Sequence, residues 1–392
     1  MDLRSKLARL RAPEARPGEP AGAASAAGAG AALLAGPSVL PFVAEEQPGG
    51  ALWVRRLRLA RSHHVGRIPL SAARDAAPGT LALLALDPSL AACAPGGALY
   101  LDTETTGLGG AGTLAFLVGL AWLEGEDVWV EQLLLRSPAE EPLLLAHLAR
   151  RVEAAGFFVT FNGKSFDLPL LEARRVMNRL PPGPARPHLD LVHVARRLHG
   201  RRLRQRRLGN LEAEVLGHVR VGDVDGSEIA ARYAHFLRTG DETALEAVVE
   251  HNLLDVLSMV ALVGLYGEPL PALCPADLAG MARTLARAGA PERALELADV
   301  AVSRGAGAEG LRARAELLRA QGDRARALAD FEALARDVDD PAVRLALAKL
   351  YEHHVRDHVR ALELVAAGTG EPPEREERRR RRLERKRDRR RP

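Results

Sequence analysis

The sequence contains only two cysteines in 392 residues, Cys93 and Cys274. So few cysteines exclude a disulfide framework and a cysteine-rich zinc site. No run of eighteen apolar residues occurs, and the amino terminus lacks the uninterrupted apolar stretch of a signal peptide. These shortages predict a protein of the reducing cytoplasm that has no membrane partner.

The hydrophobic content, 47%, is sufficient for real cores, and the length leaves room for two or three domains. The net charge of +4 conceals strong local differences. Residues 371–392 hold eleven arginines and one lysine against six acids, and the segment 195–207 holds seven arginines. We expect the first segment to be disordered by its charge. The second is interpreted as a phosphate-binding stripe, with a solvated helix and loop as the alternative.

The string LDTETTG at residues 101–107 is the most informative part of the chain. It follows an apolar run that is typical of a strand, so the side chains of Asp102 and Glu104 project from the same face. Two carboxylates on one face can hold a divalent cation between them. A solvated turn is the ordinary alternative for such a pair taken alone.

Two later segments supply further acidic groups. Asp167 ends FNGKSFD (161–167) after a second apolar run, and His251 and Asp255 lie four residues apart on a stretch with helical periodicity. Hydrolysis of a phosphodiester needs hydroxide at neutral pH and neutralisation of the leaving oxygen, and two Mg²⁺ or Mn²⁺ ions about 4 Å apart provide both. Four acidic groups from three segments therefore predict a site for two such ions. His251, with a pKa near neutrality, is the candidate proton acceptor.

DTETTG, NGKSFD and HNLLD, in this order within residues 97–268, resemble the ribonuclease H-like DEDD superfamily of 3′-to-5′ exonucleases, and most of all its YprB-like branch. The resemblance implies that the four carboxylates are metal ligands and that His251 lies beside the nucleophilic water. In the superfamily's histidine subgroup the histidine stands five residues before the last aspartate, whereas His251 stands four before Asp255. The catalytic residues implied in this way are Asp102, Glu104, Asp167, His251 and Asp255.

Other polar residues are candidates for contacts with nucleic acid. Asn162 can hydrogen-bond to a substrate or a water molecule, and the threonines before Gly107 allow a backbone to approach closely. The predicted nucleic-acid-binding residues are Thr105, Thr106, Asn162, Arg201, Arg202, Arg204 and Arg206. Asp190 is a fifth carboxylate, which we interpret as a helix cap because an amphipathic helix follows it. His63 and His64 are interpreted as structural or solvent-exposed, because no third ligand lies near them.

The fold class predicted is α/β, a ribonuclease H-like mixed sheet flanked by helices and followed by an all-α helical-repeat module. Ala294, Ala327 and Ala361 recur at spacings of 33 and 34 residues, a period that resembles tetratricopeptide repeats, with a plain helical bundle as the alternative. The predicted divisions are a disordered basic and Gly/Ala/Pro-rich N-terminus (1–50), a strand extension (51–95), the exonuclease domain (96–268), the repeats (277–368) and a disordered arginine-rich tail (369–392).

The function predicted is metal-dependent hydrolysis of nucleic acid, DNA or RNA, as a 3′-to-5′ exonuclease. Two alternatives remain open. One is a non-catalytic nucleic-acid binder that uses the same fold, and the other is a scaffold whose repeats recruit a protein partner.

Overall fold

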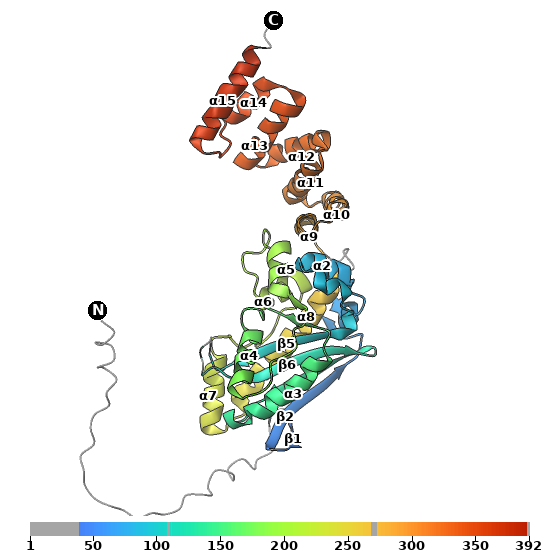
Figure 1. Cartoon of the computed structure of the whole chain (residues 1–392), viewed down its shortest axis with the longest axis vertical. Helices are drawn as coiled ribbons and strands as arrows, with labels where there is room; N and C mark the ends of the chain where they lie inside the picture. Colours follow the sequence, from blue (N-terminus) through green and yellow to red (C-terminus); the bar gives the residue numbers. More distant parts are fainter. Residues whose placement is uncertain (1–38, 108–109, 111, 268–272, 390–392) are drawn as a thin grey trace, which may run out of the picture. The chain divides into compact units, whose positions relative to one another are not determined.

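The protein, described by a computed structural model, contains a seven-stranded sheet with helices packed beside it (Figure 1). The structure describes residues 39–107, 110, 112–267 and 273–389. The strand order is β1-β2-β7-β6-β5-β8-β9, and only the β5–β8 and β8–β9 pairs are parallel. The strands are β1 (Val43–Gln47), β2 (Gly50–Leu59), β5 (Ala98–Thr105), β6 (Ala115–Glu124), β7 (Asp127–Leu134), β8 (Phe157–Thr160) and β9 (His188–Asp190).

Two helices, α3 (Glu141–Ala154) and α8 (Thr243–Gly267), cover opposite faces of this sheet. Successive side chains of a strand point to opposite faces. On β7, Glu131 bonds to His147 of α3, whereas the next residue, Gln132, bonds to Asn252 of α8. The predicted mixed sheet with helices on both faces is therefore confirmed.

The remaining elements of this part of the chain are short. A two-stranded sheet, one short helix and three 3₁₀ turns precede β5, a further 3₁₀ turn precedes α3, and four helices and a π-helical turn lie between β8 and α8. They are β3 (His64–Val65), β4 (Ile68–Pro69), η2 (Leu70–Ala73), α2 (Pro78–Ala85), η3 (Pro88–Ala92), η4 (Pro95–Gly97), η5 (Pro138–Glu140), α4 (Asp167–Met177), α5 (Leu191–Leu198), α6 (Leu208–Leu211), η6 (Glu212–Leu216) and α7 (Ile229–Thr239).

Helix α8 is the long central helix. By length and composition it is apolar enough to cross a membrane, but 78% of its most apolar stretch is buried inside the protein. Its buried residues pack against β5 and β6 and against η2. These contacts make α8 a core helix, and its length lets one element reach both the sheet and the helices that follow.

Seven helices follow α8 among the described residues. Consecutive helices pack against one another, α9 with α10, α11 with α12 and α13 with α14. Ala294, Ala327 and Ala361 each lie fully buried on the second helix of a pair, as the 33- and 34-residue spacing predicted. The helices are α9 (Pro275–Arg287), α10 (Pro291–Ser303), α11 (Gly307–Gln321), α12 (Arg324–Asp337), α13 (Pro341–Leu350), extended by the π-helical η8 (Tyr351–Val355), α14 (His358–Ala366) and α15 (Pro373–Asp388).

The division predicted between residues 268 and 277 is not a division of the hydrophobic core. Leu278, Met281 and Leu285 of α9 belong to the same buried cluster as Leu198 of α5 and Leu262 of α8. A separate cluster forms farther along, around Phe331, Leu347 and Leu383. Residues 268–272 lie outside the described part. Helices α9, α10 and α11, which follow them, contribute buried residues to the core of the sheet domain. The proline-rich connection therefore does not separate two hydrophobic cores.

The end of the chain differs from the predicted disordered tail. Helix α15 packs on α14, and its Leu383 is fully buried. Glu352, which is 0% exposed at its side chain, accepts hydrogen bonds from Arg382 at 2.7 and 2.8 Å and from Lys386 at 2.7 Å. Glu352, a buried acid outside this segment, therefore neutralises part of the positive charge for which the segment was predicted to be disordered.

The amino-terminal prediction is also modified. Residues 1–38 lie outside the described residues, but β1 falls inside the stretch expected to be disordered up to residue 50. Strand β2, in the predicted strand extension, pairs with β7 along seven residues. The strand extension is thus an integral part of the central sheet.

Candidate metal centre

Asp102 and Glu104 lie in the carboxyl-terminal half of β5, where β5 pairs with the antiparallel strand β6. Because they are two residues apart, both side chains face α8, as the sequence predicted. They line an open cavity of about 660 Å³ together with Thr105, His251 and Asp255. Two segments about 150 residues apart thus meet in one pocket.

Helix α8 brings His251 and Asp255 to this pocket on one face, one helical turn apart. His251 Nε2 lies 3.7 Å from Asp255 Oδ2 and 4.0 Å from Glu104 Oε1. One ligand atom from each of these three residues lies within 4.8 Å of the others. This grouping is compact enough for a metal ion, and its carboxylate oxygens suit Mg²⁺ or Mn²⁺.

Asn252, next to His251 on α8, connects the helix to the sheet. Its amide nitrogen donates to Asp102 Oδ2 at 2.9 Å, and its oxygen accepts from Gln132 at 2.9 Å. A Cβ at Gly119, which pairs with both Asp102 and Gln132, would lie 2.3 Å from Asn252 Oδ1. Gly119 therefore leaves the space in which the fully buried Asn252 fixes the orientation of Asp102.

Asp167 reaches the same region from a different element. It is the first residue of α4, and the N-cap residue of this helix is Phe166. Its Oδ1 accepts a 2.6 Å hydrogen bond from Thr103, the residue between Asp102 and Glu104. Thr103 therefore joins Asp167 to the strand that carries the other two carboxylates.

Asp190 has the capping role predicted for it, and a second role as well. It accepts from Val192 N–H at the start of α5, and also from the backbone N–H groups of Asn162 at 2.7 Å and Lys164 at 3.0 Å. Asn162 has φ +72°, in the left-handed region that a tight turn requires. Asp190 thus holds the turn that leads into Asp167.

The electrostatics of the pocket are those of an acidic cluster with too few cations. Burial, reinforced by Asp255, Glu104 and Asp167, raises the pKa of Asp102 well above its ordinary value. Burial is also the main cause that raises the pKa of Glu104 to about 8 and that of Asp167 to about 6. Carboxylates that repel one another in this way gain from a divalent cation, so the donor set fits the predicted metal.

His251 is held by a partner that the sequence did not indicate. Its Nδ1 lies 2.6 Å from Asp223 Oδ1, which leaves Nε2 directed toward Glu104 and Asp255. Burial opposes protonation, but the charges of Asp255, Glu104 and Asp223 together outweigh it and raise the pKa of His251. A carboxylate on one ring nitrogen fixes the tautomer and the ring orientation.

Of the predicted nucleic-acid-binding residues Thr105, Thr106 and Asn162, only Thr105 lines the pocket. Thr105 lines the pocket and donates to Gly107 O. Thr106 pairs with Leu114 through its backbone and its hydroxyl, which closes the start of the β5–β6 connection. The exposed Asn162 does not line the cavity that holds the carboxylates.

The arginine cluster after α5 is not a free basic stripe. Arg201 pairs with Glu309 of α11 at 3.2 Å, and Arg202 pairs with Asp277 of α9 at 2.8 Å. Arg206 donates to backbone oxygens of residues 203 and 204. Arg204 is exposed, and Arg207, which was not singled out, lines the pocket of the carboxylates.

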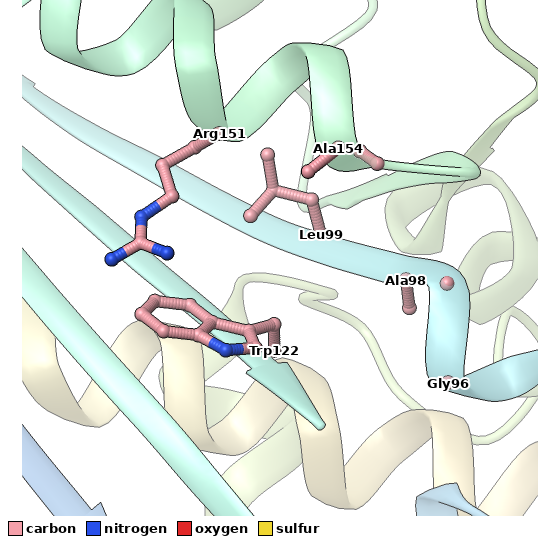
Figure 2. A pocket seen from close by; sticks show the side chains of 8 residues that line it. Gly96, Ala98, Leu99, Trp122, Arg151 and Ala154 are labelled. Atoms are coloured by element: carbon pink, nitrogen blue, oxygen red, sulfur yellow. The ribbon is translucent and has the colours of Figure 1, made fainter. Parts of the chain in front are cut away.

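Another cavity, of about 130 Å³, has a different chemistry. Figure 2 shows the Arg151 guanidinium above the Trp122 ring, 4.1 Å from its centroid, beside Leu99 and Ala154. None of the residues that line it is acidic. It therefore does not compete with the acidic pocket as a metal site.

Several residues that line the acidic pocket or support the residues lining it were not among the predicted site residues. Asn252 follows His251 directly, and its position on the inner side of a helix was the only local signal. The others are separated from the motifs in sequence and reach the pocket through tertiary structure. They are Gln132, Glu212, Arg220, Asp223 and Arg207.

Comparison with known proteins identifies the superfamily of the domain that contains the pocket. Residues 99–266 match the RNase H superfamily. The chain is also similar to YprB of Bacillus subtilis (strain 168), a protein described as uncharacterized, with 40% identity over 166 residues. That similarity covers 42% of this chain and 40% of YprB, so it concerns less than half of either protein.

The chain therefore contains an RNase H superfamily domain at residues 99–266, which confirms the predicted ribonuclease H-like fold and the resemblance to YprB, whereas the assignment to the DEDD exonucleases stays a prediction. The domain and its acidic group together suggest a nuclease-like function and binding of nucleic acid. The helical region is present as predicted, whereas its assignment to tetratricopeptide repeats stays a prediction.

Proposed function

We propose that the protein is a metal-dependent nuclease of the cytoplasm that hydrolyses phosphodiester bonds from the 3′ end of DNA or RNA. The observation that carries the proposal is the meeting of Asp102 and Glu104 with His251 and Asp255 in one pocket. Burial and mutual repulsion raise the pKa of Asp102 and Glu104, and pKa values perturbed in this way cluster at functional sites.

In the proposed site, Asp102, Glu104, Asp167 and Asp255 hold two Mg²⁺ or Mn²⁺ ions. When bound, these ions supply Lewis-acid activation of the phosphoryl group and neutralise negative charge. Asn252 orients Asp102, and the Thr103 hydroxyl orients Asp167. The carboxylates are thus fixed before substrate arrives, which lowers the cost of reorganisation.

His251 takes the proton from the attacking water at Nε2. Asp223 on Nδ1 orients the ring and stabilises the imidazolium that forms when the proton is transferred. Phe166 and Arg207 line the same cavity, where an aromatic ring stacks on a base and a guanidinium contacts a phosphate. Thr105 lies beside them as a contact for the terminal nucleotide.

The test is incubation of the purified protein with 3′- and 5′-labelled DNA and RNA oligonucleotides in Mg²⁺, Mn²⁺ or EDTA. Stepwise loss from the 3′ end that requires metal supports the proposal, and Asp102→Asn is the control for a contaminating nuclease. Internal fragments would show an endonuclease instead. Binding of oligonucleotides without hydrolysis in either metal would favour the non-catalytic scaffold.

A further inference from the structure

Arg220 has a buried side chain on the largely exposed loop between η6 and α7. The neighbouring Val219 and Val221 are 72% and 97% exposed, whereas the Arg220 side chain is 6% exposed. The backbone therefore directs the guanidinium into the protein. A buried charge is costly unless it is paired, so the partners of Arg220 explain its position.

These partners come from three elements. Arg220 Nε donates to Oε2 of the fully buried Glu212, on η6, at 2.5 Å. Its Nη2 contacts Asp255 Oδ1 on α8. Its Nη1 lies 3.3 Å from Asp223 Oδ2 and 3.1 Å from His251 Nδ1.

In both Asp255 and Asp223, one carboxylate oxygen contacts Arg220 and the other faces His251. Arg220 contacts Asp255 at Oδ1, while Oδ2 faces His251 Nε2 at 3.7 Å. Likewise, Asp223 contacts Arg220 through Oδ2 and His251 through Oδ1. One planar guanidinium therefore fixes which oxygen of Asp255 faces the acidic pocket and holds Asp223 against His251.

We propose that Arg220 is a positioning residue that fixes Asp255 and the Asp223–His251 pair in the geometry required for metal binding and proton transfer. This inference rests on the proposed nuclease function. It also predicts that lysine cannot replace Arg220. A lysine keeps the charge but lacks the rigid fork of donors that reaches several carboxylates at once.

The test compares Arg220→Lys with wild type in the full-length protein. Mn²⁺ affinity is measured by isothermal titration calorimetry, and kcat and KM are measured separately on a labelled oligonucleotide. Loss of a group that orients metal ligands typically weakens metal binding by ~10- to 100-fold. We expect a loss in that range, together with a lower kcat at nearly constant KM.

Arg174→Lys is the matched control. Arg174 is a largely buried arginine that binds Glu141 through two hydrogen bonds of 2.6 and 2.5 Å, and it does not line the acidic pocket. A general effect of losing a buried arginine fork would change the melting temperature in both variants. Only the Arg220 variant should change Mn²⁺ affinity and kcat.

Glu212→Gln provides a second variant, which retains Arg220 but removes the charge of the partner that anchors it. We expect Mn²⁺ affinity to weaken by ~3- to 10-fold in this variant, which is a fraction of the usual effect of losing an outer-shell partner. If Glu212→Gln, and Arg220→Lys wherever it folds, bind Mn²⁺ and turn over like wild type, the inference is overturned. A wild-type protein that neither binds Mn²⁺ nor hydrolyses oligonucleotides would instead refute the proposed function itself.

Discussion

The two faces of the central sheet treat buried acidic groups in opposite ways. On the α3 face, the fully buried Glu131 accepts hydrogen bonds from His147 at 2.9 Å, Arg151 at 2.9 Å and Arg56 at 2.7 Å. Although burial opposes ionisation, these partners hold the pKa of Glu131 well below its usual range. Glu131 is a carboxylate whose charge the protein itself has neutralised.

On the α8 face, Asp102, Glu104 and Asp255 have one another as neighbours. Burial and mutual repulsion raise the pKa of Asp102 and Glu104, and Asn252 and Arg220 offset only part of this effect. On the α3 face three basic side chains surround one carboxylate, whereas on the α8 face Arg220 and His251 offset only part of the charge of three carboxylates. The comparison teaches that an excess of carboxylates over built-in cations, rather than burial alone, distinguishes a candidate metal site from a structural ion pair.

The largest effect should come from Asp102→Asn. This change removes a carboxylate but keeps the shape and a partner for Asn252, so the fold should persist. A metal supplies several kcal/mol to such reactions, so hydrolysis should fall by ~10³-fold or more. Glu131→Gln, measured beside it, should keep hydrolysis but lose about 3 kcal/mol in the free energy of unfolding. The opposite pattern would reverse the assignment of the two faces.

His251→Ala should have the next largest effect. Removing a positioned proton acceptor usually costs ~10²- to 10⁴-fold in rate, and oligonucleotide binding should change little. His147→Ala is the matched histidine on the other face, and its effect should be confined to the melting temperature. A normal kcat for His251→Ala would leave this histidine a structural residue like His147.

The stability of the metal-free protein should depend on pH in the sense set by the raised pKa values. Folded-state values of about 8 for Glu104 and about 6 for Asp167, both raised mainly by burial, exceed the ordinary values of 4.5 and 3.8. The folded protein therefore holds these protons more tightly than the unfolded chain. The contribution of these two protons to the free energy of unfolding is complete below the pKa values of the unfolded chain. It is lost as the pH rises through the pKa values of the folded protein.

The melting temperature in EDTA should consequently fall by several degrees between about pH 5 and pH 8.5, and Mn²⁺ should restore it. Differential scanning calorimetry measures both effects. Glu104→Gln should flatten the pH dependence, since a glutamine does not titrate. A melting temperature that rises with pH in EDTA would contradict the proposed electrostatics.

The smallest effect should come from the arginines after α5. Like the buried acids, some of them have a partner of opposite charge within the protein and some do not. Arg201 and Arg202 pair with Glu309 and Asp277, whereas Arg204 and Arg207 form no ion pair among the described residues. Neutralising Arg204 and Arg207 should lower the salt slope of oligonucleotide binding by about one per lost phosphate contact. The matched pair of changes at Arg201 and Arg202 should affect the slope less and stability more.

Sequence patterns predicted the central sheet well because their signals are local. The sequence pattern predicts strands near 97–102, 113–123 and 127–135, and the structure has them at Ala98–Thr105, Ala115–Glu124 and Asp127–Leu134. The pattern likewise predicts a helix at 242–265, and α8 spans Thr243–Gly267. The short β9 was missed, since three residues before a helix carry too little periodicity to detect.

Charge was the least reliable guide to local order. The arginine-rich end is a helix because Glu352, some 30 residues earlier in the chain, receives Arg382 and Lys386 in a buried position. The first helix pair after α8 likewise joins the core of the sheet domain, and Asp277 accepts from the buried His199 and from Arg202. Composition describes a segment in isolation and contains no information about the partner that neutralises it.

The sequence by itself identified the acidic residues of the candidate site and showed which of them share a face. Residues two apart on a strand, or four apart on a helix, point to the same side of that element. Only the tertiary structure decided which of them lack compensating charge. It also decided that Arg220 and Asp223 approach His251 and Asp255, and that Gly119 admits Asn252 beside Asp102. Hydrogen bonds and Coulomb interactions depend on distance in space, and residues 28 to 150 positions apart in the chain come close enough only when the sheet, α8 and the loop before α7 pack together.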